Sequence, residues 1–578
     1  MKKILIFLFF ILAVAGCKKD PLNITPDGRV SLQEIFADNY QTGAYLNACY
    51  SDIPSYGTSY YFWTCLAGFS DEAHDNDNPT ESLPATTWYN GGLTTLSNPI
   101  DNTNSGATGG YYDEGWQGVR HCNVFLANIA TANVTSPSDR AQWTAEAHAL
   151  RAFYYLELIK RYGALPVETA PLSVTTDFSK ETRGTYDADV QFIVADCKAA
   201  IAEPNLPWHI TLEPDRGRMT KAIAYAIMSE ATLFNASPLN NPTNDLKKWQ
   251  QADSVSTAAL TQLTANGFQL ASDYYTYFIS TPDLGNSPAD KETIFQIKNS
   301  SGIAQIEYFS GIPEGGAYKA GDSPSQELVD SYEMANGQQP ITGYSDANHL
   351  QPIINPASGY DDKNPYVNRD PRFYATVSYN GSLYGNVNGV PYYIQAYDGG
   401  SDGIKDATGA LRDRHYTKNG YYIRKFIDPT TFSGQSGSAS WKRFRLAEIY
   451  LNLAEAENEA NGPTAAAYNA VNTVRARVNM PPLSGLTQDE LRKRIRNERR
   501  VELAWEEARF YDVRRWKILN QTDLLTTGME WTQTGNTMTN TRIVVDRRPI
   551  TAEDKYLIFP IPASEMTDLP SFVQNPGW

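Results

Sequence analysis

Side chains that could act as nucleophiles, bases or metal ligands are scattered through the sequence without a catalytic spacing. The six histidines are separated by long stretches of chain, and no H-E-x-x-H motif joins any two of them. The sequence also lacks a P-loop and the glycine pattern of dinucleotide-binding folds, and we expect no nucleophile elbow. The 65 acidic residues leave a glycosidase pair of carboxylates open, because sequence does not place two of them together. We therefore expect no catalytic residue, no cofactor and no enzymatic activity.

One short segment is rich enough in oxygen ligands to raise the question of a metal. The stretch SDEAHDNDNPTE contains Asp71, Glu72, Asp75 and Asp77. Loops of this kind can bind calcium, but the spacing lacks the EF-hand pattern and its glycine. A solvated acidic loop is the favoured interpretation, and the sequence leaves calcium binding open.

Aromatic side chains outside periodic segments could instead bind a sugar or a peptide. Tyrosine and tryptophan combine a flat apolar face with a polar edge, which suits amphipathic ligands. In LPATTWYNGG, Trp88 and Tyr89 stand among turn-forming residues and Asn90 follows them. Packing within a loop or the core is the alternative for each aromatic residue. The complete set of candidate ligand-binding residues is Trp88, Tyr89, Asn90, Trp63, Tyr308, Tyr318, Tyr366 and Arg369.

The chain begins with an export signal that ends at a cysteine. Lys2 and Lys3 precede an apolar run of 12 residues, Ile4 to Ala15. A helix of that length spans roughly 18 Å, whereas a bilayer core is about 30 Å thick. The small residues before Cys17 resemble the lipobox of bacterial lipoproteins, in which the cysteine is acylated after cleavage. We expect a signal peptide over 1–16, lipidation at Cys17 and a polar tether over 17–30.

The remaining cysteines are even in number, which permits disulfide bonds in an exported protein. They are Cys49, Cys65, Cys122 and Cys197, with no C-x-x-C pair among them. Buried free thiols are the equally weighted alternative.

Charge and composition exclude one class of partner. The formal net charge is −16, so the field of the protein repels a phosphate backbone and disfavours nucleic-acid binding. Apolar residues make up 41% of the chain, which suffices for a large core.

Apolar periodicity predicts a mainly helical protein with an irregular middle. The expected helices lie near 112–130, 145–163, 186–202, 219–236, 247–266, 441–462, 464–478 and 487–516. From about 270 to 440, loops and short strands such as ETIFQIK, RFYATVSY and YYIRKFI are expected instead. In the basic helix after Thr487, a capping box with Glu490 is expected. Charges at i,i+4, such as Glu490–Arg494 and Arg494–Glu498, predict ion pairs along that helix.

Several segments resemble the SusD/RagB family of nutrient-binding lipoproteins of Bacteroidetes outer membranes. The matching segments are NYQTGAYLNACY, EAHALRAFYYLELIKRYGALPV, DPRFYATV, RLAEIYLNLAEAENEANG, AYNAVNTVRARV, IRNERRVELAWEEARFYDVRRWK, YLIFPIPASEM and VQNPGW. They span nearly the whole chain in family order, behind a lipobox. The resemblance implies tetratricopeptide-like helix pairs forming an α-α superhelix, with a loop-rich region inserted at about 270–440. It divides the chain into an N-terminal helical region, 31–270, and a C-terminal region, 271–578, which contains the binding loops.

The resemblance also implies a function, a partner and a place. Members capture glycans, or less often peptides, at the cell surface and deliver them to a SusC-like TonB-dependent outer-membrane transporter. We expect a lipid-anchored outer-membrane protein that binds an oligosaccharide or polysaccharide, with peptide binding as the alternative and glycan hydrolysis as a remote one. The charged residues of the family motifs are expected to form buried ion pairs and packing contacts. These residues are Arg151, Arg475, Glu498, Arg499, Arg500, Arg509, Arg514, Arg515 and Trp516.

Overall fold

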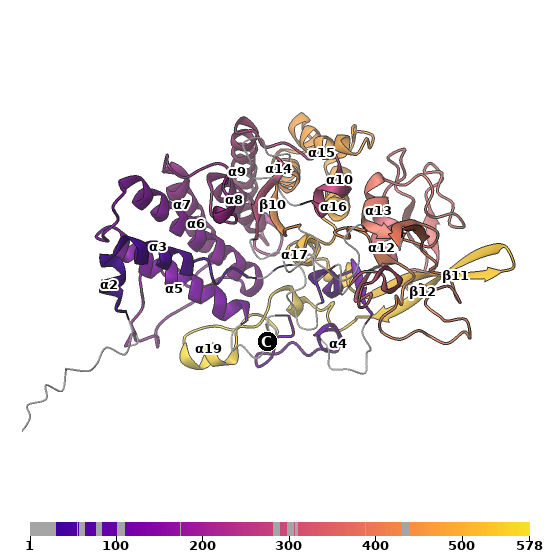
Figure 1. The fold of residues 1–578 in the computed structure, drawn as a ribbon, viewed down its shortest axis with the longest axis horizontal. Coiled ribbons are helices and arrows are strands. Elements are labelled where there is room, and N and C mark those ends of the chain that lie inside the picture. Colours follow the sequence, from indigo (N-terminus) through magenta and orange to yellow (C-terminus); the bar gives the residue numbers. More distant parts are fainter. Residues whose placement is uncertain are drawn as a thin grey trace, which may run out of the picture.

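The computed structural model shows a mainly helical protein in which a curved row of helices carries an irregular region (Figure 1). It describes residues 30–578, except 55, 57–63, 77–83, 101–109, 174, 281–289, 298–305, 307–309, 388 and 430–438. The fold class expected from the sequence is confirmed, whereas the division at 270/271 stays a prediction. Cys17 and the leader lie outside the described residues.

The longer helices pack in chain order, each against the next, except for the last of them. They are α5 (Tyr111–Ile129), α6 (Pro137–Tyr162), α7 (Tyr186–Ala202), α8 (Lys221–Ala236), α9 (Leu246–Ala265), α14 (Leu446–Asn461), α15 (Ala465–Arg477) and α16 (Gln488–Glu502). Neighbours α5 and α6, α6 and α7, α7 and α8, and α8 and α9 are in contact, as are α14 and α15, whereas α16 packs against α14 and not against α15. This serial packing is typical of helical repeats.

Local signals set the bounds of these helices. In α6, the Ser136 side chain accepts a hydrogen bond from the Asp139 amide, and Pro137 occupies the first turn. Gly163 ends the helix with φ of 72°, a conformation that favours glycine. The expected capping box of Thr487 and Glu490 is present at the start of α16.

The irregular region is inserted between two helices that are neighbours in space. Trp249 and Ala252 of α9 share a buried cluster with Ala456 of α14, although about 200 residues separate them in sequence. Because α9 and α14 pack directly, the row of helices continues across the insertion.

The strands form antiparallel pairs rather than one sheet. The pairs are β1 (Ala73–Asp75) with β3 (Asp322–Pro324), β2 (Thr293–Gln296) with β10 (Lys442–Arg445), β4 (Ile341–Tyr344) with β5 (Pro352–Ile354), β6 (Val377–Ser378) with β9 (Tyr422–Ile423), β7 (Leu383–Val387) with β8 (Val390–Tyr393), and β11 (Leu525–Thr534) with β12 (Thr537–Arg547). Short helices complete the fold: α2 (Leu32–Ala37), α3 (Asn39–Ala48), α4 (Pro84–Tyr89), α10 (Tyr274–Ile279), α12 (Gln326–Ser331), α13 (Pro371–Thr376), α17 (Ala508–Arg515), α18 (Leu519–Thr522) and α19 (Ala563–Asp568). The described residues also form four 3₁₀ turns: Leu66–Phe69, Glu213–Asp215, Pro313–Gly315 and Asp554–Leu557.

The expected strands of the middle region are only partly correct. ETIFQIK contains β2 and YYIRKFI contains β9, as predicted. RFYATVSY begins instead as helix α13, because Asp370 caps it and Pro371 favours a first helical turn. The sequence analysis also missed the longest strands, β11 and β12, whose two-residue turn begins with Gly535 at φ of 61°.

The helix expected over 487–516 is broken between α16 and α17. Trp505 and Glu507 both adopt positive φ, which no continuous helix permits. The carbonyl oxygens released by the break have side-chain donors. Those of Glu502 and Ala504 accept hydrogen bonds from Tyr274, Arg445 and Lys425. Tertiary contacts therefore stabilise the break.

The ion pairs predicted along α16 are also wrong in detail. Arg494 pairs with Glu333 of the inserted region at 2.7 Å, not with a carboxylate of its own helix. Glu498 receives hydrogen bonds from Arg372 and Arg475. Because these partners come from other elements, α16 is tied to the inserted region.

The expectation that family-motif charges form a buried scaffold is confirmed. Arg151 pairs with Asp196, Arg475 with Glu333 and Glu498, Arg499 with Asp512, Arg500 and Arg509 with Asp71, and Arg515 with Glu455 and Asp512. Arg514 donates to backbone carbonyls, and the Trp516 indole donates to Glu455.

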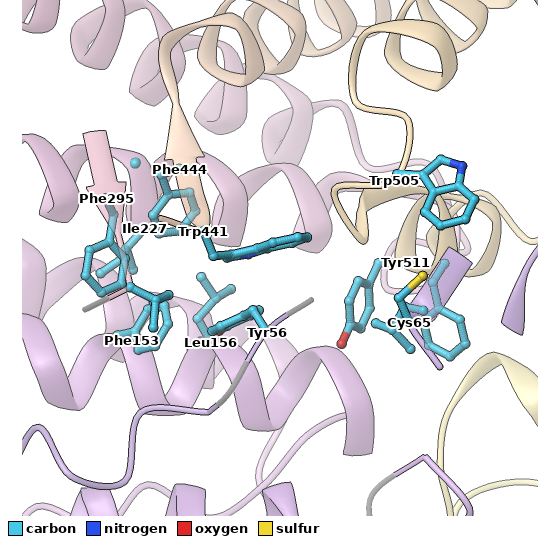
Figure 2. Close-up of a cluster of buried hydrophobic side chains, with 14 of the residues drawn as sticks. Tyr56, Cys65, Phe153, Leu156, Ile227, Phe295, Trp441, Phe444, Trp505 and Tyr511 are labelled. Atoms are coloured by element: carbon cyan, nitrogen blue, oxygen red, sulfur yellow. The ribbon is translucent and has the colours of Figure 1, made fainter. Parts of the chain in front are cut away.

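An aromatic core joins the helices to the β2–β10 pair (Figure 2). The ring of Phe153 in α6 lies 5.5 Å from that of Phe295 in β2, in an edge-to-face contact. Phe295 in turn stacks 6.4 Å from Phe444 of β10. The four remaining cysteines are buried free thiols, which settles the question left open by the sequence.

Candidate functional site

Trp88 packs in the core, which corrects its assignment as a ligand contact. Its side chain has no exposed surface, and it lies on helix α4 rather than in a loop. The rings of Phe69, Phe510, Tyr556 and Phe559 surround it at 5.3 to 6.1 Å. The sequence analysis missed this packing because the partners come from distant parts of the chain.

The neighbours of Trp88 separate into one buried and one exposed residue. Tyr89 is buried; its hydroxyl donates to the Gly68 carbonyl, and the Arg548 guanidinium lies 3.9 Å from its ring centre. Asn90 is exposed in the turn that ends α4. Tyr89 is therefore structural, whereas a role for Asn90 in ligand binding stays a prediction.

Tyr366 and Arg369 are likewise part of the core. The Tyr366 hydroxyl donates to Tyr421 and accepts from the Trp531 indole. Arg369 is 1% exposed and donates to three backbone carbonyls, those of Val329, Tyr332 and Pro365. Both side chains are therefore buried in the core and present little surface to a ligand. Trp63 and Tyr308 lie outside the described residues.

The acidic segment is not a solvated loop where the structure describes it. Asp71 is buried between Arg500 at 2.8 Å and Arg509 at 2.7 Å. Burial by itself would raise the pKa of Asp71, but the two guanidinium groups hold it below its usual value. Glu72 beside it is also buried, and burial together with the Asp71 charge raises the pKa of Glu72 to about 8.

The rest of that segment gives no metal site among the described residues. Asp75 accepts a hydrogen bond from Thr64 and lies in strand β1, while Asp77 is outside the described residues. No three His, Cys, Asp or Glu side chains converge as metal ligands in the described parts of the chain.

Tyr318 is exposed in the described structure and lies in a loop with other aromatic residues. Its side chain is 45% exposed. The 3₁₀ turn Pro313–Gly315 and Gly316, with φ of 92°, reverse the chain just before it. The ring of His415 meets that of Tyr318 edge-to-face at 5.1 Å. We refer to Glu314, Tyr318, Tyr392, Arg412, His415 and Tyr416 as the Tyr318 surface.

A buried asparagine anchors the loops that form this surface. The Asn76 amide nitrogen donates to the Ala320 carbonyl, and its side-chain oxygen accepts from the Lys418 amide at 2.8 Å. The Ala320 amide also donates directly to the His415 carbonyl at 2.9 Å. Two segments almost 100 residues apart are thereby held at a fixed separation.

The other members of the Tyr318 surface provide polar edges around aromatic faces. The Arg412 guanidinium lies 4.5 Å from the centre of the Tyr416 ring. The Tyr392 hydroxyl donates to Asp402 at 2.7 Å, which orients that half-buried ring. Burial raises the pKa of Tyr416, and the charge of the exposed Glu314 raises it further.

A motif that the sequence analysis overlooked lies next to Tyr392 of this surface. Residues 399–403 read G-G-S-D-G, which fits the letters G-x-S-x-G. A nucleophile elbow requires a strand, a sharp turn and a helix, whereas these residues form turns with no helix after them. Ser401 Oγ lies 2.9 Å from the Tyr392 hydroxyl and donates to Asp402, and no described histidine is hydrogen-bonded to it. The motif therefore lacks the geometry of a catalytic serine.

The geometry of the Tyr318 surface suits binding rather than bond cleavage. Exposed tyrosine faces can stack on the CH face of a sugar ring, and guanidinium, imidazole and carboxylate groups can bond its hydroxyls. Of its members, only Tyr318 was selected from the sequence. The run RDRHYTKNGYY, aromatic residues among turn formers, was the available signal for His415 and Tyr416.

None of the helices that the structure describes combines the length and the apolarity needed to cross a membrane.

Comparisons with known proteins identify the class. Residues 291–578 match the model of the SusD family, and residues 67–233 match a model described as starch-binding associating with outer membrane. The SusD-like protein P2 of Formosa agariphila is 23% identical over 544 residues, which cover 90% of this chain and 92% of that protein. The chain belongs to the SusD/RagB family.

Solved structures agree with this assignment. A SusD-like protein from Bacteroides fragilis is 26% identical, with a TM-score of 0.75, and the match covers 95% of this chain and 100% of that one. A laminarin-binding SusD-like protein has the same fold at 22% identity and a TM-score of 0.57, covering 94% of this chain and all of that one.

Proposed function

We propose that this protein binds an oligosaccharide or polysaccharide at the Tyr318 surface without cleaving it. The observation that supports this most directly is the exposed Tyr318 face beside His415, Arg412 and Glu314 on anchored loops. Because those loops are fixed before binding, little conformational entropy is lost when a sugar stacks there. Membership of a family with a laminarin-binding relative is consistent with a glycan ligand.

The proposal extends to location and partner. Cys17 is acylated and holds the protein at the outer membrane, where it delivers the glycan to a SusC-like TonB-dependent transporter. The lipobox-like sequence before Cys17 and the outer-membrane description of the matching family model support this. Several acyl chains anchor a protein durably, whereas one chain does not.

Calorimetry with the chain lacking its leader tests the binding site. We expect Tyr318→Ala to lower the affinity for the bound glycan more than tenfold, because the stacking face is lost, with no change in melting temperature. Laminarin and starch are the first glycans to titrate, and incubation with either should give no shorter product.

The matched control is Tyr393→Ala. Tyr393 is 56% exposed on β8, next to Tyr392 in sequence, but successive side chains of a strand point to opposite faces. Glycan affinity should be unchanged in this variant. Equal loss in both variants, or none in Tyr318→Ala, would remove the Tyr318 surface from the site. Affinity for peptides alone would contradict the glycan proposal.

The lipid anchor has a separate test. Cells that express the full chain should incorporate labelled palmitate into the protein, and Cys17→Ala should abolish the label and release the protein from the membrane fraction. An unlabelled protein of native sequence would contradict the proposed anchor, independently of glycan binding.

A further inference from the structure

A second candidate site lies away from the Tyr318 surface and joins the N-terminal helices to the C-terminal segment. A groove of about 550 Å³ runs between α5, the segment 166–181 that follows α6, and the segment 565–572 at α19. No residue of the Tyr318 surface lines it. Figure 1 shows α5 and α19 side by side near the C-terminus, far from α12 and α13 of the inserted region. We refer to this as the α5 groove.

The floor of the groove is apolar and aromatic. Tyr112 and Trp116 lie one helical turn apart on α5, and their rings meet edge-to-face at 6.3 Å. Phe178, Leu569 and Phe572 line the groove from the opposing segments. Trp116 is only half-buried, so part of its ring is available to a ligand.

Carboxylates surround this apolar floor in two groups. The first group is Asp113, Glu565 and Asp568. Burial raises the pKa of Glu565, and the charges of Asp113 and Asp568 raise it further. The groove thus brings like charges together, and no cation is among the described groups that shift the pKa of Glu565.

The second group is Glu168 and Glu181. Burial raises the pKa of Glu168, and the charge of Glu181 raises it further. Among the described lining residues, Arg120 is the one base, and its guanidinium donates to the Leu172 carbonyl at 2.8 Å. The groove is therefore strongly acidic at neutral pH.

The walls of the groove are held in place by buried polar contacts. Asn123 donates to the carbonyls of Glu168 and Ala170, and Arg151 donates to the Asn123 side chain at 2.7 Å. The Glu168 amide donates to the Tyr155 hydroxyl at 2.6 Å. The segment that carries the second acidic group is thus fixed to α5 and α6 before any ligand arrives.

We propose that the α5 groove binds short amphipathic cations, namely peptides in which Lys or Arg flanks an apolar or aromatic residue. Its volume lies in the range of about 300–1,000 Å³ that small ligands occupy. An ammonium or guanidinium group of the peptide bonds each of the two carboxylate groups, and the apolar residue packs on Trp116. This inference goes beyond glycan binding and does not depend on it.

The test titrates the chain lacking its leader with the peptide Lys-Trp-Lys, blocked at both termini, and with Glu-Trp-Glu as a charge-reversed probe. Lys-Trp-Lys should bind with an affinity that falls at high salt, and Glu-Trp-Glu should not bind. No binding of Lys-Trp-Lys at millimolar concentration, or equal binding of both peptides, would overturn the proposal.

Isosteric variants locate the site. Asp113→Asn combined with Glu565→Gln should weaken Lys-Trp-Lys binding more than tenfold, with an unchanged or higher melting temperature because the repulsion is removed. Tyr318→Ala is the matched control and should leave peptide affinity unchanged. Peptide binding that survives the double substitution, or that is lost with Tyr318, would place the peptide elsewhere and contradict the inference.

Discussion

At the scale of single residues, the neighbours in space rather than in sequence decide what an aromatic side chain does. Trp88 and Tyr318 both stand among turn-forming residues, and the sequence favoured Trp88 over Tyr318 as a ligand contact. The first is fully buried among four rings, whereas the second is nearly half exposed. Only the second can meet a ligand.

This difference predicts a stability effect for Trp88→Ala. Removing a fully buried tryptophan should lower the free energy of unfolding by about 3–5 kcal/mol, because a large cavity replaces its ring contacts. Thermal melting checks this, with Tyr393→Ala as the exposed aromatic control. Glycan affinity of the folded protein should stay the same. A variant that melts like the parent but loses glycan binding would restore Trp88 to the site.

At the scale of elements, buried charges fasten segments that have little periodicity of their own. Asp71, in the segment before strand β1, forms ion pairs with Arg500 of α16 and Arg509 of α17. Glu72, the next residue, is buried beside Asp71. One of its carboxylate oxygens accepts a hydrogen bond of 3.4 Å from the Trp505 amide. The burial of Glu72 beside Asp71 is unfavourable, because two carboxyl groups are crowded together.

This crowding predicts an unusual pH dependence. The pKa of Glu72 is about 8 in the folded protein, against 4.5 ordinarily, so the folded state binds a proton that the unfolded state has lost. The contribution of Glu72 to the free energy of unfolding therefore falls as pH rises from about 4.5 to 8. Glu72→Gln should raise the melting temperature at pH 8 more than at pH 5. An equal shift at both pH values would contradict the protonated state.

At the scale of the whole molecule, one carboxylate connects the inserted region to the helices. Glu502 of α16 accepts hydrogen bonds from Arg372 of α13, Arg445 of β10 and Arg477 of α15. Burial alone would raise the pKa of Glu502, but the three guanidinium groups outweigh it and hold the pKa well below 4.5. Segments more than 100 residues apart thereby meet at one buried site.

Glu502→Gln is therefore expected to destabilise the protein by about 3–5 kcal/mol at pH 7, because buried guanidinium groups lose a counter-charge. A carboxyl with a depressed pKa stabilises above its ordinary pKa, and this stabilisation is lost as pH falls below about 4.5. The melting temperature of the parent should fall more than that of the variant between pH 6 and pH 3.

The control is Glu553→Gln, which removes an exposed pair with Lys555 at 3.8 Å and should change stability little. Equal acid sensitivity of parent and variant would contradict this account.

The sequence by itself determined most of the longer helices, the helical class and the scaffold role of the charged motifs, because periodicity and caps act over a few residues. It also identified the family through segments such as RLAEIYLNLAEAENEANG. The tertiary structure alone decided which tryptophans and tyrosines are exposed, where α16 ends, and which arginine meets which acid. Those outcomes depend on contacts between residues hundreds of positions apart, such as Arg500 with Asp71 and Asn76 with Lys418, and no local pattern encodes them.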